Sequence, residues 1–283
     1  MITGHRLFIK ANCLFVVAMI CSAACHPRKD QSGDSVSRPG AAALKPAPIH
    51  DQGMTVETRF LLPDGFHRTA ENTGSFGTYL RRLPLKPEGT RVRYYNGDEK
   101  RAEGVYVAVI DMEIGRSDLQ QCADAVMRLR GEWLYSRGAY DRIQFNFLSD
   151  GQPRKFIDFK DGDVTRPVFR QYMDYVFTYA NTASLHDEMV PVPSVEDIRV
   201  GDVLIMKRHP WGHAVIVVDL AEHEQSGRKI CLLAQSYMPA QDIQILVNIH
   251  DPDLSPWYHV RTGLIRTPEW TFESGDFRRF PEE

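Results

Sequence analysis

The chain has 283 residues, of which 43% are hydrophobic, and its formal net charge is −3. This composition supports a substantial core, and the small negative charge gives no reason to expect nucleic acid as a partner. No internal repeat is visible, and no segment after the N-terminus has the pattern of a transmembrane span.

The first 24 residues have the pattern of an export signal. Arg6 and Lys10 give a basic start, and residues 14–21 form an apolar run too short to span a bilayer comfortably. Ser22-Ala23-Ala24-Cys25 is similar to a bacterial lipoprotein processing site, at which Cys25 becomes the lipidated N-terminus. The alternative is an ordinary cleaved signal peptide. Both interpretations predict export, and the first predicts a membrane-anchored lipoprotein on the periplasmic or cell-surface side.

Residues 25–50 are rich in Pro, Ser, Gly, Ala and charge, without an apolar period, which predicts a flexible tether. Residues 51–283 then suffice for a single large domain, which we expect to be a monomer. The expected helices are Phe76–Leu83, Asp118–Arg137 and Phe169–Tyr179. The expected strands are Arg91–Tyr95, Val105–Ile110, Ile143–Phe147, Val203–Met206, His213–Val218, Lys229–Ser236 and Gln244–Asn248, with Trp257–Tyr258 and Thr262–Arg266 closing the domain. Helices early and an antiparallel meander late predict an α+β fold.

The helix expected at Asp118–Arg137 carries a cysteine near its start. Its apolar face is formed by Leu119, Cys122, Val126, Leu129 and Trp133, at spacings of 3, 4, 3 and 4. Cys122 therefore has two interpretations, a buried core residue or a nucleophile whose pKa the helix dipole lowers. The amide of Gln121 or Gln120 is positioned to donate to an oxyanion, although both are also ordinary first-turn residues.

A histidine begins one of the later strands. Gly212 permits close backbone approach beside His213, which is either a structural residue or the partner of the thiol. A hairpin centred near Glu224 places Gln235 opposite His213 on one face, where its amide oxygen can accept the imidazole N–H. Ser236 and Asp219 are less favoured for that third role.

Two aromatic residues flank these positions in the sequence. Trp211 precedes His213 by two residues and Tyr237 follows Gln235 by two, so both are candidates to wall a substrate groove. We expect no metal, because Pro210 and Gly212 prevent the helix that would bring His209 and His213 onto one face, and we expect no cofactor.

Cys122 and Cys231 are the two cysteines of the expected domain. Cys231 lies within an apolar strand and is expected in the core. In an oxidising compartment the two cysteines could instead form a disulfide with each other.

The order of Cys122, Gly201-Asp202, Gly212-His213-Ala214-Val215 and a polar residue on the next strand resembles the papain-like cysteine hydrolases, of the NlpC and CHAP types. The chain more closely resembles an uncharacterised family of exported bacterial lipoproteins, from about Phe60 to Phe272. That resemblance rests on Arg82–Pro87, Asp118–Ala125, Gly212–Asp219, Leu233–Gln241 and Ser255–Tyr258. The sequence departs from the NlpC and CHAP patterns: neither Ser nor Gly follows Cys122, the segment before His213 is long, and the third residue is Gln.

The resemblance implies a papain-like, NlpC-type fold, with an N-terminal helix carrying Cys122 packed on an antiparallel sheet carrying His213. It implies a cysteine peptidase or amidase that cleaves an amide bond in peptide or peptidoglycan, with Cys122, His213 and Gln235 as catalytic residues. The alternatives are a non-enzymatic lipoprotein that binds peptide or glycan in the same groove, and a structural domain in which Cys122 is core.

Overall fold

The structure is a computed structural model and describes residues 49–281. Its helices are α1 (Val56–Arg59), α2 (Phe76–Arg81), α3 (Cys122–Ser136), α4 (Arg166–Tyr179) and α5 (Thr182–Glu188). Its strands are β1 (Phe66–Arg68), β2 (Tyr106–Val109), β3 (Gln144–Asn146), β4 (Pro153–Lys155), β5 (Val190–Pro191), β6 (Val203–Met206), β7 (His213–His223), β8 (Lys229–Gln235), β9 (Gln244–Leu246), β10 (Tyr258–Val260), β11 (Leu264–Arg266), β12 (Thr271–Glu273) and β13 (Phe277–Arg279).

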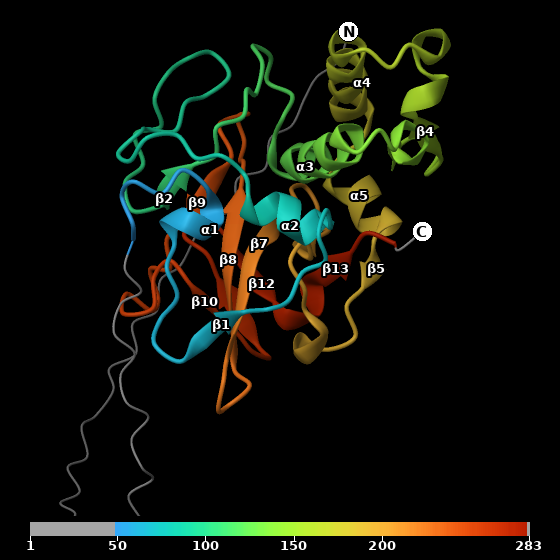
Figure 1. Ribbon diagram of the computed structural model, residues 1–283. Helices are drawn as coiled ribbons and strands as arrows, with labels where there is room; N and C mark the ends of the chain where they lie inside the picture. The colour runs from blue at the N-terminus through green and yellow to red at the C-terminus, as the bar shows by residue number, and fades with distance from the viewer. Residues whose placement is uncertain (1–48, 282–283) are drawn as a thin grey trace, which may run out of the picture. The chain divides into compact units, whose positions relative to one another are not determined.

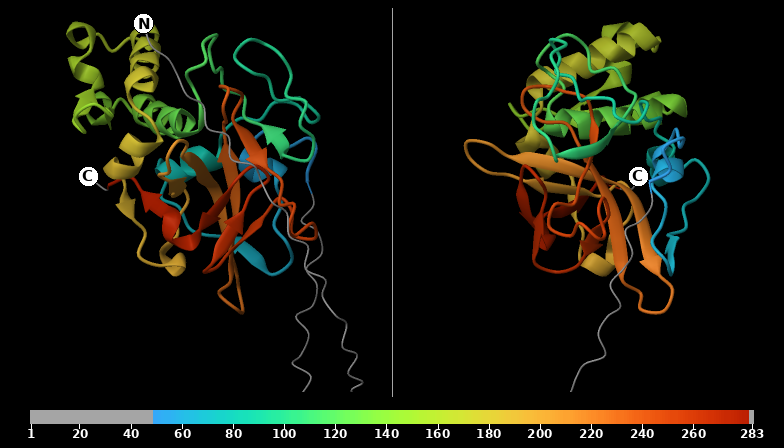
Figure 2. Two further views of the ribbon diagram at one scale, coloured as in Figure 1. Left: turned by 180° about the vertical axis from the view of Figure 1, so that it is seen from behind. Right: turned by 90° about the vertical axis from the view of Figure 1, so that its left-hand side faces the viewer.

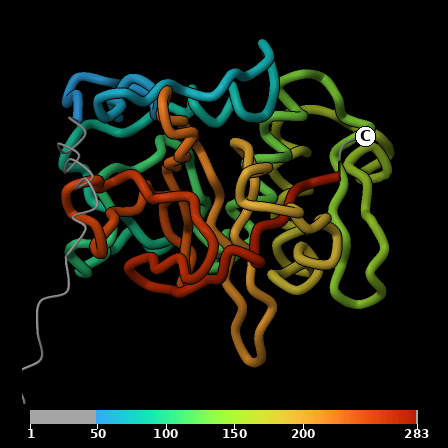
Figure 3. Tube along the Cα trace, turned by 90° about the horizontal axis from the view of Figure 1, so that it is seen from below, coloured from blue at the N-terminus to red at the C-terminus, as the bar shows by residue number. Residues whose placement is uncertain are grey.

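A nine-stranded antiparallel sheet dominates the described part of the chain (Figure 1). Its main path runs β2-β9-β8-β7-β6-β13-β5, while β1 pairs with β7 and β10 with β8. The long strand β7 lies near the centre, and nine of its eleven residues are buried. A residue run that is apolar and buried on both faces is typical of a central strand. The hairpin that joins β7 to β8 extends beyond the neighbouring segments (Figure 3).

The helices are few and mostly short. The two longest, α3 and α4, contact each other and lie with α5 at one end of the sheet (Figures 1 and 2). Three helices, α1, α2 and α3, contact β7. Helix α3 therefore lies against the strand that begins with His213.

The papain-like, NlpC-type α+β fold expected from the sequence is wrong. The sheet has nine strands and the helices are few and short, rather than forming a helix-on-sheet arrangement of the papain-like kind. Much of the extra sheet comes from β1, β5, β10 and β13, which have two or three residues each. Segments this short give no measurable alternation, so sequence periodicity does not reveal them.

Several expected elements are present with shifted ends. The helix expected from Asp118 begins at Cys122, because residues 118–121 form a turn that caps it. Strand β7 continues to His223, five residues past its expected end. The strand expected at Arg91–Tyr95 is wrong, since only isolated bridges from Arg93 to Glu99 and from Tyr94 to Gln241 occur there.

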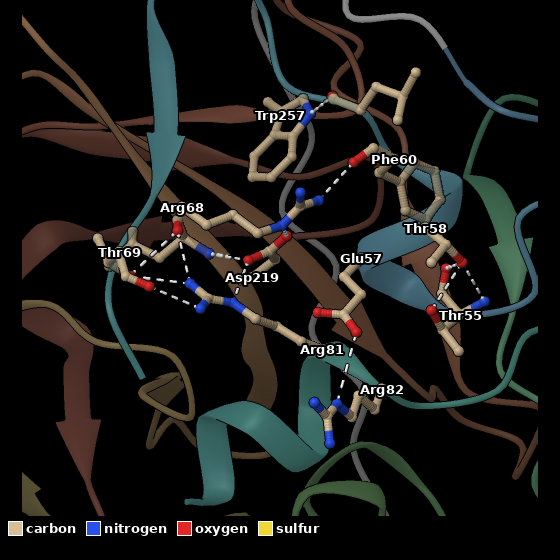
Figure 4. A network of polar contacts seen from close by, with 12 residues as sticks. Thr55, Glu57, Thr58, Phe60, Arg68, Thr69, Arg81, Arg82, Asp219 and Trp257 are labelled. Carbon is tan, nitrogen blue, oxygen red and sulfur yellow. Dashed lines mark hydrogen bonds and ion pairs between the residues drawn. The ribbon is translucent and has the colours of Figure 1, made fainter. Parts of the chain in front are cut away.

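Two buried carboxylates tie separate elements to the sheet. Asp219 on β7 accepts hydrogen bonds from Nε of Arg68 at 2.7 Å and from Nε of Arg81 at 2.6 Å (Figure 4). Asp202, just before β6, accepts from Nε of Arg279 at 2.7 Å and from Nη2 of Arg279 at 2.8 Å. Each carboxylate pairs with a guanidinium, as burial of charge requires.

The expected signal peptide, Cys25 and almost all of the expected tether lie outside the described residues. Within residues 49–281, no helix combines the length and the apolar character that a membrane crossing needs.

Candidate functional site

Cys122 is the first residue of α3 and directly follows its N-cap, Gln121. Its side chain is largely buried, with 7% exposed. The sulfur lies 3.8 Å from Oγ1 of Thr182, the first residue of α5, and receives backbone N–H groups from Ala123 and Ala214. Because Ala214 follows His213, the thiol lies beside the start of β7.

The turn before α3 is fixed by the segment that follows β8. Oγ of Ser236 donates to the backbone oxygen of Gln120 at 3.1 Å, and the backbone N–H of Ala240 donates to Oδ1 of Asp118 at 2.7 Å. These two bonds anchor residues 118–120 to residues 236–240. The start of α3 is thereby held against the end of the strand that carries Gln235.

His213 is the first residue of β7 and is 2% exposed. Its Nε2 lies 2.8 Å from Oε1 of Gln235, the last residue of β8. The register differs from the expected one, because Ile216 pairs with Ala234, which leaves Gln235 diagonal to His213 rather than directly opposite. Diagonal neighbours on one face remain within reach of long side chains.

Aromatic rings surround the imidazole. Tyr237 lies edge-on at 4.9 Å between ring centroids, Trp270 at 5.2 Å, and Phe272 is stacked at 5.9 Å. Trp211, expected to wall a groove, is 61% exposed in the loop between β6 and β7. Of the two predicted substrate-binding residues, Tyr237 thus lies against the candidate base, while Trp211 is an exposed aromatic surface nearby in sequence.

The polar contacts of Gln235 continue away from His213. Nε2 of Gln235 donates to Oε2 of Glu269 at 2.7 Å, and Nζ of Lys100 donates to both carboxylate oxygens of Glu269 at 2.8 Å. Lys100 is only 3% exposed and its Nζ lies 5.6 Å from the centroid of the Tyr237 ring. Four side chains from four separate segments thus form one hydrogen-bond network, which consists of His213, Gln235, Glu269 and Lys100.

The two glutamines before Cys122 differ in their contacts. Nε2 of Gln121, the predicted oxyanion donor, donates to Oδ1 of Asp118 at 3.0 Å. Gln120 is fully buried, its Oε1 accepts from Nη1 of Arg128 at 3.0 Å, and its Nε2 has no hydrogen-bond partner among the described residues. Gln120 therefore has a buried Nε2 without a partner among the described residues, whereas Gln121 uses one of its two N–H groups for Asp118.

The electrostatics of the site favour neutral groups. Burial raises the pKa of the Cys122 thiol, and the nearby Asp124 raises it further, against the lowering by Thr182 and the two backbone N–H groups. Burial lowers the pKa of His213 to about 4, opposed by the hydrogen bond to Gln235 and assisted by the charge of Lys100. The expected lowering of the thiol pKa by the helix dipole is therefore outweighed by desolvation.

The remaining candidates have other partners. Ser236 is hydrogen-bonded to the turn before α3, and Asp219 forms ion pairs with Arg68 and Arg81. The hydrogen-bond partner of His213 is Gln235 instead. Cys231 and Cys122 are free thiols, and burial raises the pKa of Cys231 to about 12. Within residues 49–281, no three His, Cys, Asp or Glu side chains are grouped so as to hold a metal ion.

Sequence reasoning did not identify Thr182, Lys100 or Glu269. Thr182 opens α5, which was not expected, and Lys100 lies in an irregular segment. Glu269 lies in the turn between β11 and β12, where no pattern distinguishes it from an exposed turn carboxylate. Only their long-range contacts reveal them.

We expect that Gly212→Ala disturbs the thiol environment. A Cβ at this position would lie 2.5 Å from the carbonyl oxygen of Met206 and 2.9 Å from Cγ2 of Thr182, the residue whose hydroxyl contacts Cys122. Overpacking of this kind costs roughly 1–3 kcal/mol, so urea unfolding is expected to show that loss. Gly275→Ala is the matched control, since a Cβ there meets nothing within 4 Å. Equal stability of the two variants would contradict this prediction.

Comparison with known proteins gives a family. The family model described as a domain of unknown function, DUF4846, matches residues 56–279. The chain belongs to this family. No curated protein and no solved structure matches the chain significantly.

Proposed function

We propose that the protein is an exported thiol hydrolase that cleaves an amide bond in cell-wall peptide, with Cys122 as nucleophile and His213 as base. One observation carries the proposal: Nε2 of His213 is hydrogen-bonded to Oε1 of Gln235, while the N–H of the adjacent Ala214 donates to the Cys122 sulfur. The Cys122 thiol thus contacts the residue that follows His213, and a thiol with an imidazole as its base is the pair that nucleophilic catalysis uses.

In the proposed reaction both groups begin neutral. Nδ1 of His213 accepts the thiol proton as the Cys122 sulfur attacks the carbonyl carbon, which forms a C–S bond and an oxyanion. The imidazolium then gives the proton to the leaving amine nitrogen, the C–N bond breaks, and a thioester remains. Water attacks the thioester with His213 as base, and the C–S bond breaks to restore the thiol and release the acid.

The oxyanion would be held by donors at the start of α3. The first backbone N–H groups of a helix have no partner within the helix and carry partial positive charge. Gln120 supplies a buried side-chain donor without a partner among residues 49–281, two residues before Cys122. We therefore assign the side-chain contribution to Gln120 rather than to Gln121, which donates one of its two amide hydrogens to Asp118.

The proposed setting follows from the N-terminal sequence. The signal-like residues 1–24 and Cys25 support an exported chain that a lipid anchors to a membrane. The exposed ring of Trp211 and the half-buried ring of Tyr237 are the proposed contacts for a peptide or glycan chain. The anchor would keep the domain near its substrate as a monomer.

A second candidate function is non-enzymatic binding of peptide or glycan at the same place. The raised pKa of the Cys122 thiol and the burial of both Cys122 and His213 favour it, since an unreactive neutral pair suffices for a binding protein. Turnover distinguishes the two functions.

Thiol labelling tests the assignment of the nucleophile. With a soluble electrophile at pH 7.5, the wild-type protein is expected to label at Cys122 and not at Cys231, which is buried in β8. Cys231→Ala should keep this reactivity and Cys122→Ala should abolish it. His213→Ala should slow labelling, because the base is lost. Labelling that occurs only after unfolding would overturn the proposed nucleophile.

Turnover of cell-wall peptide fragments tests the reaction itself. Release of new amine ends is expected from the wild-type protein, and we expect Cys122→Ala to lose it while fragment binding remains nearly intact. Trp211→Ala should weaken binding instead. Binding without any release of amine ends by the wild-type protein would favour the second candidate function.

A further inference from the structure

The hydrogen bonds behind His213 have a fixed direction. An ionised carboxylate only accepts hydrogen bonds, so Glu269 must face the N–H side of the Gln235 amide. In the structure, Nε2 of Gln235 donates to Oε2 of Glu269 at 2.7 Å. The opposite side of the amide, Oε1, then faces His213 at 2.8 Å. An amide oxygen is also only an acceptor, so Nε2 of His213 must carry the proton.

Lys100 holds the side chain of Glu269 in place beside Gln235. Its ammonium group donates to both carboxylate oxygens at 2.8 Å, and its own side chain is 3% exposed. Each oxygen of the Glu269 carboxylate thus accepts a hydrogen bond from the same Lys100 group. The hydrogen-bond network therefore runs from Lys100 through Glu269 and Gln235 to the imidazole, and the donor and acceptor at each step are fixed.

We propose that Glu269, held by Lys100, is a positioning residue that selects the Nε2–H tautomer of His213 through the Gln235 amide, and so leaves the lone pair of Nδ1 for the Cys122 thiol. This inference rests on the proposed function for its catalytic meaning. The tautomer itself is a property of the folded protein and is measured without any substrate.

The other side chains in contact with the His213 ring do not reverse this selection. The remaining contacts of His213 are the rings of Tyr237, Trp270 and Phe272, and the cation facing this group is Lys100. The turn that carries Glu269 also carries Trp270, and Phe272 follows on β12. The same hairpin therefore encloses the imidazole and supplies the carboxylate that orients it.

Exchange of the charged pair gives the sharpest test. In Lys100→Glu/Glu269→Lys the ion pair is kept, but position 269 becomes a donor. The Gln235 amide should then turn its oxygen toward Lys at position 269 and its N–H toward His213, which selects the Nδ1–H tautomer. Nitrogen NMR of labelled histidine at pH 7 reports the tautomer directly, since the ring is neutral well above its pKa of about 4. The His213 signal is assigned by its loss in His213→Ala.

The wild-type protein is expected to show Nε2–H over Nδ1–H by up to about tenfold, the ratio that one neutral hydrogen bond supports. The exchanged variant should show the reverse preference. Lys100→Met is the matched control, because Glu269 remains an acceptor and the Nε2–H tautomer should persist. If the exchanged variant does not fold, Lys100→Met/Glu269→Lys makes the same reversal without a carboxylate at the buried position 100.

An Nδ1–H tautomer in the wild-type protein, or an unchanged Nε2–H tautomer in the folded reversed variants, would overturn the inference. The failure of the proposed function looks different. In that case the tautomer would reverse as expected, while Cys122 would remain unreactive and no peptide would be cleaved. If both hold, the reversed variants should also lose thiol reactivity, because the Nδ1 lone pair is gone.

Discussion

Replacing Asp124 with Asn is expected to remove a large pH dependence of folding stability. Burial raises the pKa of this carboxyl to about 8 from 3.8, so the folded protein keeps a proton that the unfolded chain releases. Stability from this group is fully present below pH 3.8 and is lost as the pH rises through 8. The loss approaches about 6 kcal/mol at its upper limit, by linkage at 1.36 kcal/mol per pKa unit.

Urea unfolding at pH 5 and pH 9 measures this difference. The wild-type protein should lose stability between these values, and Asp124→Asn should lose much less. Glu188, whose pKa burial raises to about 7, contributes to the remainder, as do Asp174 and Asp202, whose pKa values burial also raises. Asp253→Asn is the control, since that side chain is exposed. An unchanged pH dependence in Asp124→Asn would show that Asp124 is ionised in the folded state.

The same substitution bears on the thiol. The charge of Asp124 is one of the causes that raise the pKa of Cys122. Asp124→Asn removes that charge, so labelling of Cys122 at pH 9 is expected to become faster.

The effect of His213 on folding stability has the opposite pH dependence. Its pKa of about 4 in the folded protein lies below the ordinary value of 6.5, so its contribution to stability is present above pH 6.5 and is lost as the pH falls through 4.

The strand pattern in the sequence predicted the partner of His213 correctly, but it did not predict how β7 and β8 are paired. The alternation of strand faces was enough to select Gln235 as the residue whose amide can face His213, and the two are hydrogen-bonded. The register was wrong because a bulge between Val217 and Asp219 and a shorter turn shift the pairing. Neither feature leaves a sequence signal that separates it from a regular hairpin.

The residues that surround Cys122, His213 and Gln235 could not be predicted from the sequence. Lys100, Thr182 and Glu269 reach the site from three segments far apart in the chain, and a single sequence carries no information on such distances. Of the two interpretations of Cys122, the lowered pKa is not what the structure shows, because burial at the helix start raises the pKa of the thiol. Electrostatics of a site depend on everything packed around it.

The fold class failed for a related reason. The resemblance to papain-like proteins rested on the order of a few residues around Cys122 and His213, which occupy a small part of the domain. The sheet is extended by strands of two or three residues, and pairs such as Arg278 with Val203 join positions 75 residues apart. Short non-local strands depend on tertiary pairing rather than on local propensity.

Asp219→Ala is expected to destabilise the protein by about 3–5 kcal/mol, the cost of breaking a buried ion pair by removing one partner. The side chain of Asp219 is fully buried between Arg68 and Arg81, and Arg81 is itself only 7% exposed (Figure 4). Without the carboxylate, two guanidinium groups from β1 and α2 would lack their anionic partner at the bulge of β7. Thermal unfolding at pH 7 measures the loss.

Glu99→Ala provides the contrast, because Glu99 and Arg93 form an ion pair that is about half exposed on both sides. Exposed pairs contribute about 0–1 kcal/mol, so this variant should unfold near the wild-type temperature. The His213 tautomer should be unchanged in Asp219→Ala, since Asp219 binds the two arginines and Gln235 binds the imidazole. A stable Asp219→Ala protein with an altered His213 tautomer would instead assign Asp219, the less favoured candidate from the sequence, to the orientation of the base.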